Sequence, residues 1–414
     1  MLSEFEKYII LKKDKIKISS LEVKKGDVFL ALQGRNFHGN KFIKSSIEKG
    51  ARFCLTDKKG YLKSSKVIFV ENIFSYLKKI AVKKRKLYKG KVLGITGSAG
   101  KTTLKETLAF FLKKEYSISY SKKSYNNELG IIVSLLNLNL KSNYSIFEIG
   151  TNNFGEIKYL TSIVMPTDIF ITNIQSTHLK NFKSKKNIAR EKSDIFIYKY
   201  NEKRKNLYLN VKNKYEKIIL NKEKKEENLK IIHLETYDKK YFIKKVTKYK
   251  NYYKITLSIN NKIIILKQKS YTLFRLINLL FCYAFYDKNK LNFTSINKRL
   301  KFLKPVEGRG LSHIIYINKK KIKLIDESYN ANPDTMYQSI DYFKSIRKAQ
   351  NKKILILGNM NELGDISYQM HYNLLNELDK TFFKFIILCG EFYKRSKKNL
   401  INPKNKFIYL ENKN

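Results

Sequence analysis

Tryptophan is absent from this sequence of 414 residues, and only four prolines and three cysteines are present. The cysteines, Cys54, Cys282 and Cys389, lie far apart and do not show the close spacing of metal ligands. A disulfide framework is therefore excluded as the basis of the fold, and so is a cysteine-rich metal site. Because this cysteine usage is typical of a reducing compartment, we expect a cytoplasmic protein.

A long hydrophobic run is also missing. The longest apolar stretch, around residues 273–285, contains Arg275 and is shorter than the ~20 residues that span a bilayer. The first ten residues carry Glu4 and Glu6, which do not fit a signal peptide. We therefore predict no membrane span. At ~100–200 residues per domain, the length predicts about two to four domains.

Acidic residues are scarce, since 35 stand against 85 basic ones and the formal net charge is +50. Such a charge is typical of proteins that bind nucleic acid or an anionic membrane surface. However, ten of the basic residues are arginine and 75 are lysine, and the lysines are spread along the whole chain. Because base readers usually need arginine forks, we interpret the charge as a bias of composition and expect no specific nucleic-acid partner. An anionic nucleotide substrate would benefit from the charge in either case.

Three parts can be distinguished along the chain: residues 1–88, 89–304 and 305–414. The first part ends in a basic run, and Pro305 marks a linker before the third. Apolar runs of strand length are found at 28–32, 67–70, 92–96, 145–149, 168–172, 322–325, 353–357 and 385–388. Because these strands alternate with helical patterns, we predict an α/β protein with parallel sheets. Residues 201–265 are highly charged and alternate locally, which predicts an antiparallel insert or a sheet edge.

The strongest local signal is the segment 94–103, Gly-Ile-Thr-Gly-Ser-Ala-Gly-Lys-Thr-Thr. It follows an apolar strand and precedes an amphipathic helix, which is the context of a phosphate-binding loop. Glycines let backbone N–H groups turn toward phosphate oxygens, and the helix N-terminus adds partial positive charge. Lys101 would reach the β- and γ-phosphates, and Thr102 would face Mg²⁺. The spacing is unusual, because Ile95 occupies a position where a glycine is expected.

Three further residues are candidates of unequal strength. Glu148 ends an apolar strand, and Gly150 follows two positions later. The carboxylate would therefore lie at the edge of the sheet, beside the phosphate site. A carboxylate in that position suits Mg²⁺. A solvated strand end is the alternative. His178 follows another strand, although a lone histidine is more often structural. By its local pattern, Lys192 is typical of a solvated helix lysine.

These residues converge on a family. Five segments resemble the central domain of the Mur ligases in the same order, namely 94–103, 125–130, 147–150, 172–179 and 189–196. Three later segments, 307–309, 326–333 and 357–364, resemble the members that add D-alanyl-D-alanine, and Ser-Tyr-Asn-Ala-Asn-Pro at 328–333 is the most specific. Residues 26–34 resemble the UDP-binding domain of the family, although 19–21 and 38–40 depart from its pattern. The resemblance extends from about residue 19 to 390.

The resemblance implies a three-domain α/β fold. Residues 1–88 would form a UDP-sugar domain, and 89–304 a central P-loop ATPase domain with a parallel sheet. Residues 305–414 would form a Rossmann-like C-terminal domain that stops short of the family's usual end. The implied activity is ATP-dependent joining of D-alanyl-D-alanine to UDP-N-acetylmuramoyl-tripeptide in peptidoglycan precursor synthesis, through an acyl phosphate. A monomer is expected.

The resemblance also implies the site residues. Lys101, His178 and Lys192 would be catalytic, with Lys192 carbamylated, and ATP and Mg²⁺ would be the cofactors. The expected Mg²⁺ ligands are Thr102, Glu148, His178 and Lys192. Asn126 and Asn127 would meet the substrate. The expected ATP-binding residues are Gly97, Ser98, Ala99, Gly100, Lys101, Thr102, Thr103, Arg309, Asp326, Glu327 and Asn330, with Arg309 and one of the two acids forming a ribose clamp.

Alternatives remain at this point. Within the enzyme class they are a tripeptide-forming Mur ligase and a folylpolyglutamate ligase, both disfavoured by the segment 329–333. Outside it they are a basic nucleic-acid-binding ATPase and a catalytically dead relative that only binds. Because the chain retains Lys101, Glu148, His178 and Lys192, we favour an active enzyme.

Overall fold

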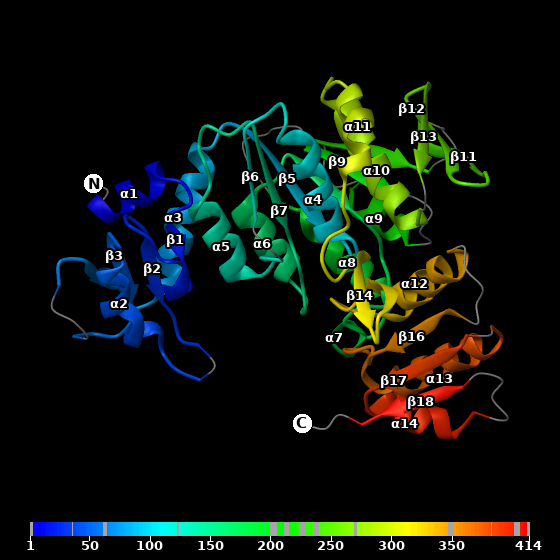
Figure 1. Ribbon diagram of the computed structural model, residues 1–414. Helices are drawn as coiled ribbons and strands as arrows, with labels where there is room; N and C mark the ends of the chain where they lie inside the picture. Colours follow the sequence, from blue (N-terminus) through cyan, green and yellow to red (C-terminus); the bar gives the residue numbers. More distant parts are fainter. Residues whose placement is uncertain are drawn as a thin grey trace.

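The computed structural model describes residues 3–34, 36–60, 64–121, 124–198, 205–210, 215–223, 228–235, 240–268, 271–346, 352–381, 383–400 and 406–411. Three successive parts of the chain follow one another across the molecule in Figure 1, with the N-terminal part at one end and the C-terminal part at the other. None of the helices within these ranges combines the length and apolar character that a bilayer crossing requires.

The N-terminal part is a parallel sheet of four strands in sequence order. The strands are β1 (Ile16–Lys17), β2 (Val28–Ala31), β3 (Phe53–Thr56) and β4 (Val67–Phe69), and the helices are α1 (Glu4–Leu11), α2 (Ile43–Glu48) and α3 (Ile73–Leu87). β2 and β3 are buried throughout, as expected of parallel strands covered on both faces. Ser3 and Glu6 form a capping box that fixes the start of α1.

The central part is built on a parallel sheet of six strands in the order β10-β9-β8-β5-β7-β6. Its strands are β5 (Lys91–Thr96), β6 (Ile118–Tyr120), β7 (Tyr144–Glu148), β8 (Asp168–Ile171), β9 (Lys205–Asn210) and β10 (Leu229–Leu234). Its helices are α4 (Lys101–Leu112), α5 (Glu128–Leu136), α6 (Glu156–Val164), α7 (Leu179–Phe182), α8 (Lys185–Ser193), α9 (Glu216–Glu223), α10 (Leu273–Lys288) and α11 (Thr294–Arg299). Because β5 lies between β7 and β8, the loop that follows it opens beside the ends of both neighbours.

Successive residues of β5 face opposite sides of this sheet. Val92 belongs to a hydrophobic core that also contains residues of α1, α3, α5 and α6. Leu93 belongs to a second core formed with α4, α10 and the neighbouring antiparallel sheet. The predicted amphipathic helix is confirmed as α4, because Leu104, Leu108 and Phe111 are all fully buried in this second core.

The charged segment 201–265 forms both of the structures that its pattern allowed. β9 and β10 extend the central parallel sheet. After them come β11 (Tyr241–Lys248), β12 (Tyr253–Ile259) and β13 (Lys262–Gln268), which form a separate antiparallel sheet.

The C-terminal part has its own small core and its own parallel sheet of three strands. The strands are β16 (Ile354–Leu357), β17 (Phe385–Cys389) and β18 (Phe407–Leu410), and the helices are α12 (Pro333–Ser345), α13 (Ser367–Asp379) and α14 (Glu391–Lys398). The predicted strand 322–325 lies elsewhere. It belongs to β15 (Lys320–Asp326), which pairs antiparallel with β14 (Leu311–Ile317). The strand itself is confirmed, but periodicity does not reveal the partner of a strand, and here that partner is antiparallel.

Candidate active site

The loop between β5 and α4 has the backbone geometry of a phosphate-binding loop. Gly97 and Gly100 have φ angles of 141° and 80°, which side chains other than hydrogen rarely tolerate. A Cβ at Gly97 would lie 1.9 Å from Thr172 Oγ1, and one at Gly100 would lie 2.0 Å from the Phe274 ring. Both glycines are therefore required by conformation and by close contact. Gly100 is the N-cap of α4, so the first N–H groups of that helix open onto the adjacent cavity.

The segment that follows β8 holds this loop in place. The Ser98 N–H donates to the Asn173 carbonyl at 3.0 Å, and the Ala99 N–H donates to Asn173 Oδ1 at 2.9 Å. In return, Thr172 Oγ1 donates to the Ala99 carbonyl at 2.6 Å, and the Gln175 N–H donates to Ser98 Oγ at 2.9 Å. Two motifs that are far apart in the sequence are thus joined into one rigid unit.

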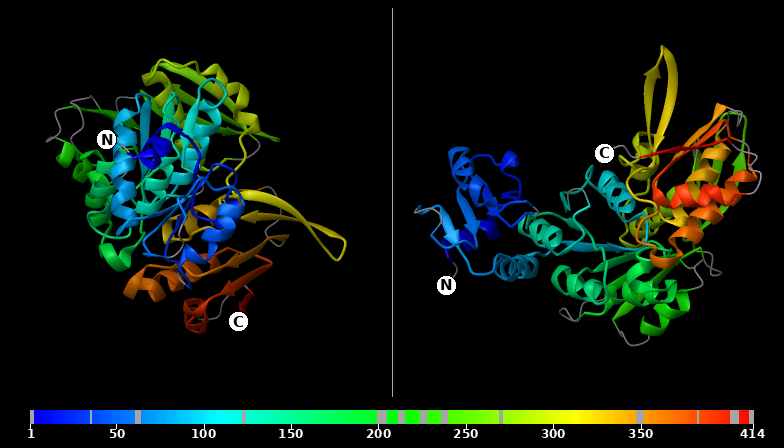
Figure 2. Two further views of the ribbon diagram at one scale, coloured as in Figure 1. Left: turned by 90° about the vertical axis from the view of Figure 1, so that its left-hand side faces the viewer. Right: turned by 90° about the horizontal axis from the view of Figure 1, so that it is seen from below.

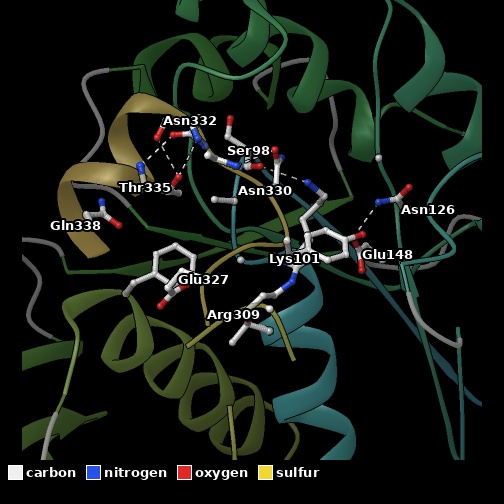
Figure 3. A pocket seen from close by; sticks show the side chains of 18 of the residues that line it. Ser98, Lys101, Asn126, Glu148, Arg309, Glu327, Asn330, Asn332, Thr335 and Gln338 are labelled. Carbon is white, nitrogen blue, oxygen red and sulfur yellow. Dashed lines mark hydrogen bonds between the residues drawn. The ribbon is translucent and has the colours of Figure 1, made fainter. Parts of the chain in front are cut away.

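Lys101 lies at the start of α4, where its side chain folds back over the loop. Its Nζ donates to the Gly97 carbonyl at 2.8 Å. Burial, with a smaller contribution from the Arg309 guanidinium, lowers the pKa of Lys101, and Glu148 opposes this shift. Figure 3 shows Lys101, Glu148 and Asn126 along one side of the cavity.

Glu148 is at the C-terminal end of β7 and is 1% exposed. Thr102 Oγ1 donates to its Oε2 at 2.7 Å, and Asn126 Nδ2 donates to its Oε1 at 3.0 Å. The ammonium of Lys105, itself fully buried, lies 3.9 Å from Oε2. The reading of Glu148 as a solvated strand end is therefore wrong, since the carboxylate is buried and oriented by three neighbours. Within the described ranges, no three His, Cys, Asp or Glu side chains gather as a complete metal site.

His178 is placed between the central and C-terminal parts. It precedes α7 with a left-handed backbone, at a φ of 52°. Its Nδ1 lies 2.5 Å from Glu362 Oε2, and the Lys180 N–H donates to the Glu362 carbonyl at 3.1 Å. Glu362 also has a positive φ, 64°. The motif at 357–364 thus contacts the histidine loop directly.

Lys192 is 1% exposed, so the expectation of a solvated helix lysine is wrong. Burial and the nearby charge of Lys101 hold the pKa of Lys192 well below its ordinary value. Its ammonium makes no hydrogen bond or ion pair with any side chain or carbonyl that the structure describes. Burial favours the neutral form of a lysine, and the neutral amine is the nucleophilic form.

The opposite wall of the cavity comes from the C-terminal part. The Arg309 guanidinium stacks over the Tyr329 ring, with 4.0 Å from Cζ to the ring centroid. Glu327 and Asn330 line the same wall, whereas Asp326 does not line the cavity and its side chain accepts from the Ser328 N–H. Of the two acids predicted for the ribose clamp, Glu327 is therefore the one in position. Asn332, in the most specific motif, caps α12 by accepting from the Thr335 N–H at 3.0 Å.

A cavity of about 340 Å³ lies between these walls, and most of the predicted site residues line it. The predicted residues that line it are Ser98, Ala99, Gly100, Lys101, Thr103, Asn126, Asn127, Glu148, His178, Arg309, Glu327 and Asn330. Gly97, Thr102, Asp326 and Lys192 do not line it. Of these four, Thr102 donates a hydrogen bond to the lining residue Glu148, and the Gly97 carbonyl accepts one from the lining residue Lys101.

Several lining residues were missed by sequence reasoning. Thr272, Phe274 and Arg275 come from the start of α10, and Gln338 and Ser339 come from α12. One signal was available for the first group, because Arg275 is the charge that interrupts the longest apolar stretch. The α12 residues gave no signal, since they look like an ordinary helix face. Figure 3 shows Thr335 and Gln338 across the cavity from Glu148.

A second cavity, of about 470 Å³, adjoins the first and shares Thr103 and Arg275 with it. Its walls are largely apolar and include Phe110, Leu276 and Leu279. Asn278 also lines it and is 2% exposed, and its Nδ2 has no hydrogen-bond partner among the described residues. A buried amide that faces an apolar cavity suits a flat ligand with polar ring atoms.

Known proteins resemble this chain over most of its length. The model of the Mur ligase middle domain matches residues 95–286, and that of the Mur ligase family catalytic domain matches residues 14–105. The UDP-N-acetylmuramoyl-tripeptide–D-alanyl-D-alanine ligase of Rickettsia prowazekii is 32% identical over 367 residues, which cover 87% of this chain and 79% of that protein. This chain belongs to the Mur ligase family. The protein of the same description from Buchnera aphidicola (Acyrthosiphon pisum) is 29% identical and covers 96% of this chain and 87% of its own length.

Solved structures confirm the fold of this Mur ligase. MurF from Acinetobacter baumannii superposes with a TM-score of 0.80 at 24% identity, over 95% of this chain and 84% of that one. MurF from Thermotoga maritima in complex with ADP gives 0.76 at 21% identity, over 99% of this chain and 95% of that one. The predicted three-domain α/β architecture, the family and the ligase class are thereby confirmed.

Proposed function

We propose that this Mur ligase joins D-alanyl-D-alanine to UDP-N-acetylmuramoyl-tripeptide, with conversion of ATP to ADP and phosphate, in peptidoglycan precursor synthesis. The observation that carries the proposal is the composition of the cavity. A phosphate loop forms one wall, and the segment with Ser-Tyr-Asn-Ala-Asn-Pro forms the other. The 32% identical relative carries the same description. Such an enzyme belongs in the cytoplasm, where ATP and the precursors are found.

The chemistry that the cavity must perform is activation of a carboxylate. A carboxylate is a poor acylating agent because oxide is a poor leaving group. Transfer of the γ-phosphoryl group to the tripeptide carboxylate makes an acyl phosphate, which the amine of the dipeptide attacks to give amide and phosphate. Phosphoryl transfer depends mainly on positioning and charge neutralisation. Lys101 supplies the neutralising charge at the loop, and the first N–H groups of α4 add to it.

The donor set around Glu148 fits Mg²⁺, which commonly takes one or two carboxylates together with phosphate oxygens. Glu148 and Thr102 are already 2.7 Å apart and would hold the ion together. When bound, Mg²⁺ neutralises charge on the transferred phosphate. His178 and a carbamylated Lys192 would complete a second position. Because Lys192 is a buried amine of depressed pKa, its nitrogen can add to carbon dioxide with loss of a proton, which gives a carbamate with anionic oxygen ligands.

The nucleotide would span both cavities. Its phosphates would lie against Ser98–Thr103, and its ribose between Arg309 and Glu327, with Asn330 nearby. The base would enter the second cavity, where the apolar walls suit a flat ring and Asn278 offers an amide donor. Asn126 and Asn127 would meet the muramoyl-peptide substrate beside the γ-phosphate.

Each of the three parts of the chain would bind a different reactant. Residues 1–88 would bind the UDP-sugar, 89–304 would bind ATP, and 305–414 would carry the incoming amine. The chain would act as a monomer without a specific nucleic-acid partner. A tripeptide-forming or folylpolyglutamate ligase shares the loop but not the segment 329–333, so the accepted amine decides between these functions.

The test is phosphate release from ATP with UDP-N-acetylmuramoyl-tripeptide, measured with and without D-alanyl-D-alanine. Full turnover should require the dipeptide, and free amino acids or oligonucleotides should not replace it. Lys101→Ala should lower turnover by about 10²-fold or more with an unchanged circular dichroism spectrum, since one charge at the developing phosphate is removed. Lys114→Ala, in the exposed turn after α4, is the matched control and should behave as wild type. Near-normal turnover of Lys101→Ala would remove the phosphate-loop assignment.

A further inference from the structure

The hairpin β14–β15 projects from the body of the molecule. Its register runs from Leu311 opposite Asp326 to Ile317 opposite Lys320. The two-residue turn is Asn318-Lys319, with φ angles of 47° and 62°, as in a type I′ turn. Figure 2 shows the ribbon extending away from the helices of the C-terminal part. No other strand in the described part of the chain pairs with either edge.

Near its tip the hairpin exposes large apolar side chains. Tyr316 is 69% exposed, Ile317 54% and Ile314 51%, and Ile322 and Leu324 on the partner strand are also exposed. A two-stranded hairpin that buries so little is only marginally stable alone. By the register, Ile314 and Tyr316 lie on one face of the ribbon, and Ile317, Ile322 and Leu324 lie on the other. Apolar side chains exposed on both faces of a projection favour an apolar surrounding for its tip.

The charge of the same hairpin has one sign. Lys319, Lys320, Lys321 and Lys323 lie within five positions at the tip, and residues 311–325 contain no aspartate or glutamate. In the register, Lys321 lies opposite Tyr316 and Lys323 lies opposite Ile314. Each ammonium is therefore beside an apolar side chain. This mixture of apolar and cationic groups on one projection is the chemistry of a headgroup–acyl boundary.

We propose that the tip of the β14–β15 hairpin, residues 314–324, binds the surface of an anionic lipid bilayer. A second copy of the chain is disfavoured, because each copy carries +50 and the tip adds like charge. Nucleic acid is disfavoured because the apolar residues are mainly aliphatic and the tip has no arginine, whereas base recognition uses arginine and aromatic stacking. Of these three partners, a lipid surface is the one that suits both the isoleucines and the lysines.

The base of the hairpin joins this surface to the active site. The Gly310 N–H donates to the Asp326 carbonyl at 2.7 Å, which closes the ribbon where Arg309 and Glu327 enter the cavity wall. The seven residue pairs of the hairpin lie between these residues and the turn. Binding at the tip would therefore orient the enzyme on a membrane while leaving the cavity free.

The absence of tryptophan provides a direct reporter of binding. Tyr316→Trp introduces a single indole at the tip. Its emission should shift to the blue with vesicles of phosphatidylcholine and phosphatidylglycerol, and should not shift with vesicles of phosphatidylcholine alone. An unchanged spectrum with both kinds of vesicle would overturn the proposal.

Co-sedimentation with the same anionic vesicles gives the second measurement. Tyr316→Ser with Ile317→Ser, or Lys319→Glu with Lys321→Glu, should weaken binding by about tenfold or more. The matched control is Ile263→Ser with Ile265→Ser in β13, which removes two isoleucines of similar exposure, 50% and 54%. It should bind as wild type, and every variant should keep the wild-type rate of phosphate release without vesicles. Equal loss in the β13 control would show that exposed isoleucines in general, and not the hairpin, carry the binding. Unchanged binding by both double variants of the hairpin would also overturn the proposal.

Discussion

Lys84 in α3 and Lys192 in α8 are both buried, at 0% and 1% exposure. Lys84 donates to three carbonyls, those of Ile9 at 2.8 Å, Lys12 at 2.7 Å and Leu136 at 2.6 Å. These carbonyls lie at the C-terminal ends of α1 and α5, where helices leave acceptors unpaired. Lys192 has no comparable acceptor among the described residues.

The difference separates a structural lysine from a reactive one. Lys84 joins the N-terminal part to the central part, and beside it Arg85 Nε donates to the Val164 carbonyl at 2.6 Å. Lys192 makes no comparable hydrogen bond, so the desolvation cost of burying its amine is not offset in this way. A buried amine with that cost and no acceptor is a candidate for chemistry. The comparison therefore makes opposite predictions for stability and activity at the two positions.

The largest effect is expected at Lys192. Lys192→Ala should lower ligation by about 10²-fold or more while changing the unfolding midpoint little, because no hydrogen bond to a described residue is lost. Phosphate release and thermal unfolding measure the two quantities. Short-chain carboxylates should restore part of the activity by occupying the vacated position. A variant with normal turnover, or wild type that is unaffected by prolonged equilibration in carbon-dioxide-free buffer at mildly acidic pH, would contradict the carbamate.

Lys84→Met should show the reverse pattern. It leaves three buried carbonyls without a donor, and we expect a loss of about 3 kcal/mol in the free energy of unfolding. The folded fraction should retain near-normal turnover, since the residue is remote from the cavity. Urea unfolding gives the free energy, and Lys83→Met is the matched control because Lys83 is exposed on the same helix. Equal destabilisation by both variants would indicate a loss of helix propensity instead of lost hydrogen bonds.

The pH dependence of stability should also differ. Burial lowers the pKa of Lys84 to about 7, against about 10.4 in an unfolded chain. Between these values the unfolded state binds the extra proton, so this residue makes the free energy of unfolding rise with pH and fall as pH drops toward 7. The gap between wild type and Lys84→Met should therefore widen from pH 7 to pH 9. A constant gap over this range would mean that Lys84 stays charged in the fold.

Sequence patterns predicted the site features that are defined by residues close together along the chain. The phosphate loop was predicted because strand, glycines, Lys101 and helix follow one another, and Glu148 because it ends an apolar strand. Both lysines of the comparison were invisible by this logic. Lys84 lies in a basic run that looks like a boundary, and its acceptors are 52 to 75 residues away in the sequence. The resemblance, and not the local pattern, singled out Lys192.

The smallest effect is expected for the partly exposed ion pair between Lys185 and Asp334, which joins the central and C-terminal parts. Lys185 Nζ lies 3.2 Å from both oxygens of Asp334 in α12, and Asp334 also accepts from the Ser176 N–H at 2.9 Å. Because both side chains are about one-third exposed, the pair contributes at most about 1 kcal/mol. Asp334→Asn should lower turnover a few-fold, more at low salt than at high salt. Because asparagine can still accept from the Ser176 N–H, an effect that does not depend on salt would contradict a role for the ion pair.

The hydrogen bonds between Asn173 and the phosphate loop have a consequence for ligand entry. The N–H groups of Ser98 and Ala99 are bonded to Asn173 within the protein, and the Phe274 ring packs against Gly100. The conformational entropy of ordering these residues, about 1–2 kcal/mol each, is therefore lost when the chain folds and not when ATP arrives. The loop is therefore preformed. Phosphate binding does not have to offset the entropy of ordering its backbone, so more of the contact free energy contributes to affinity.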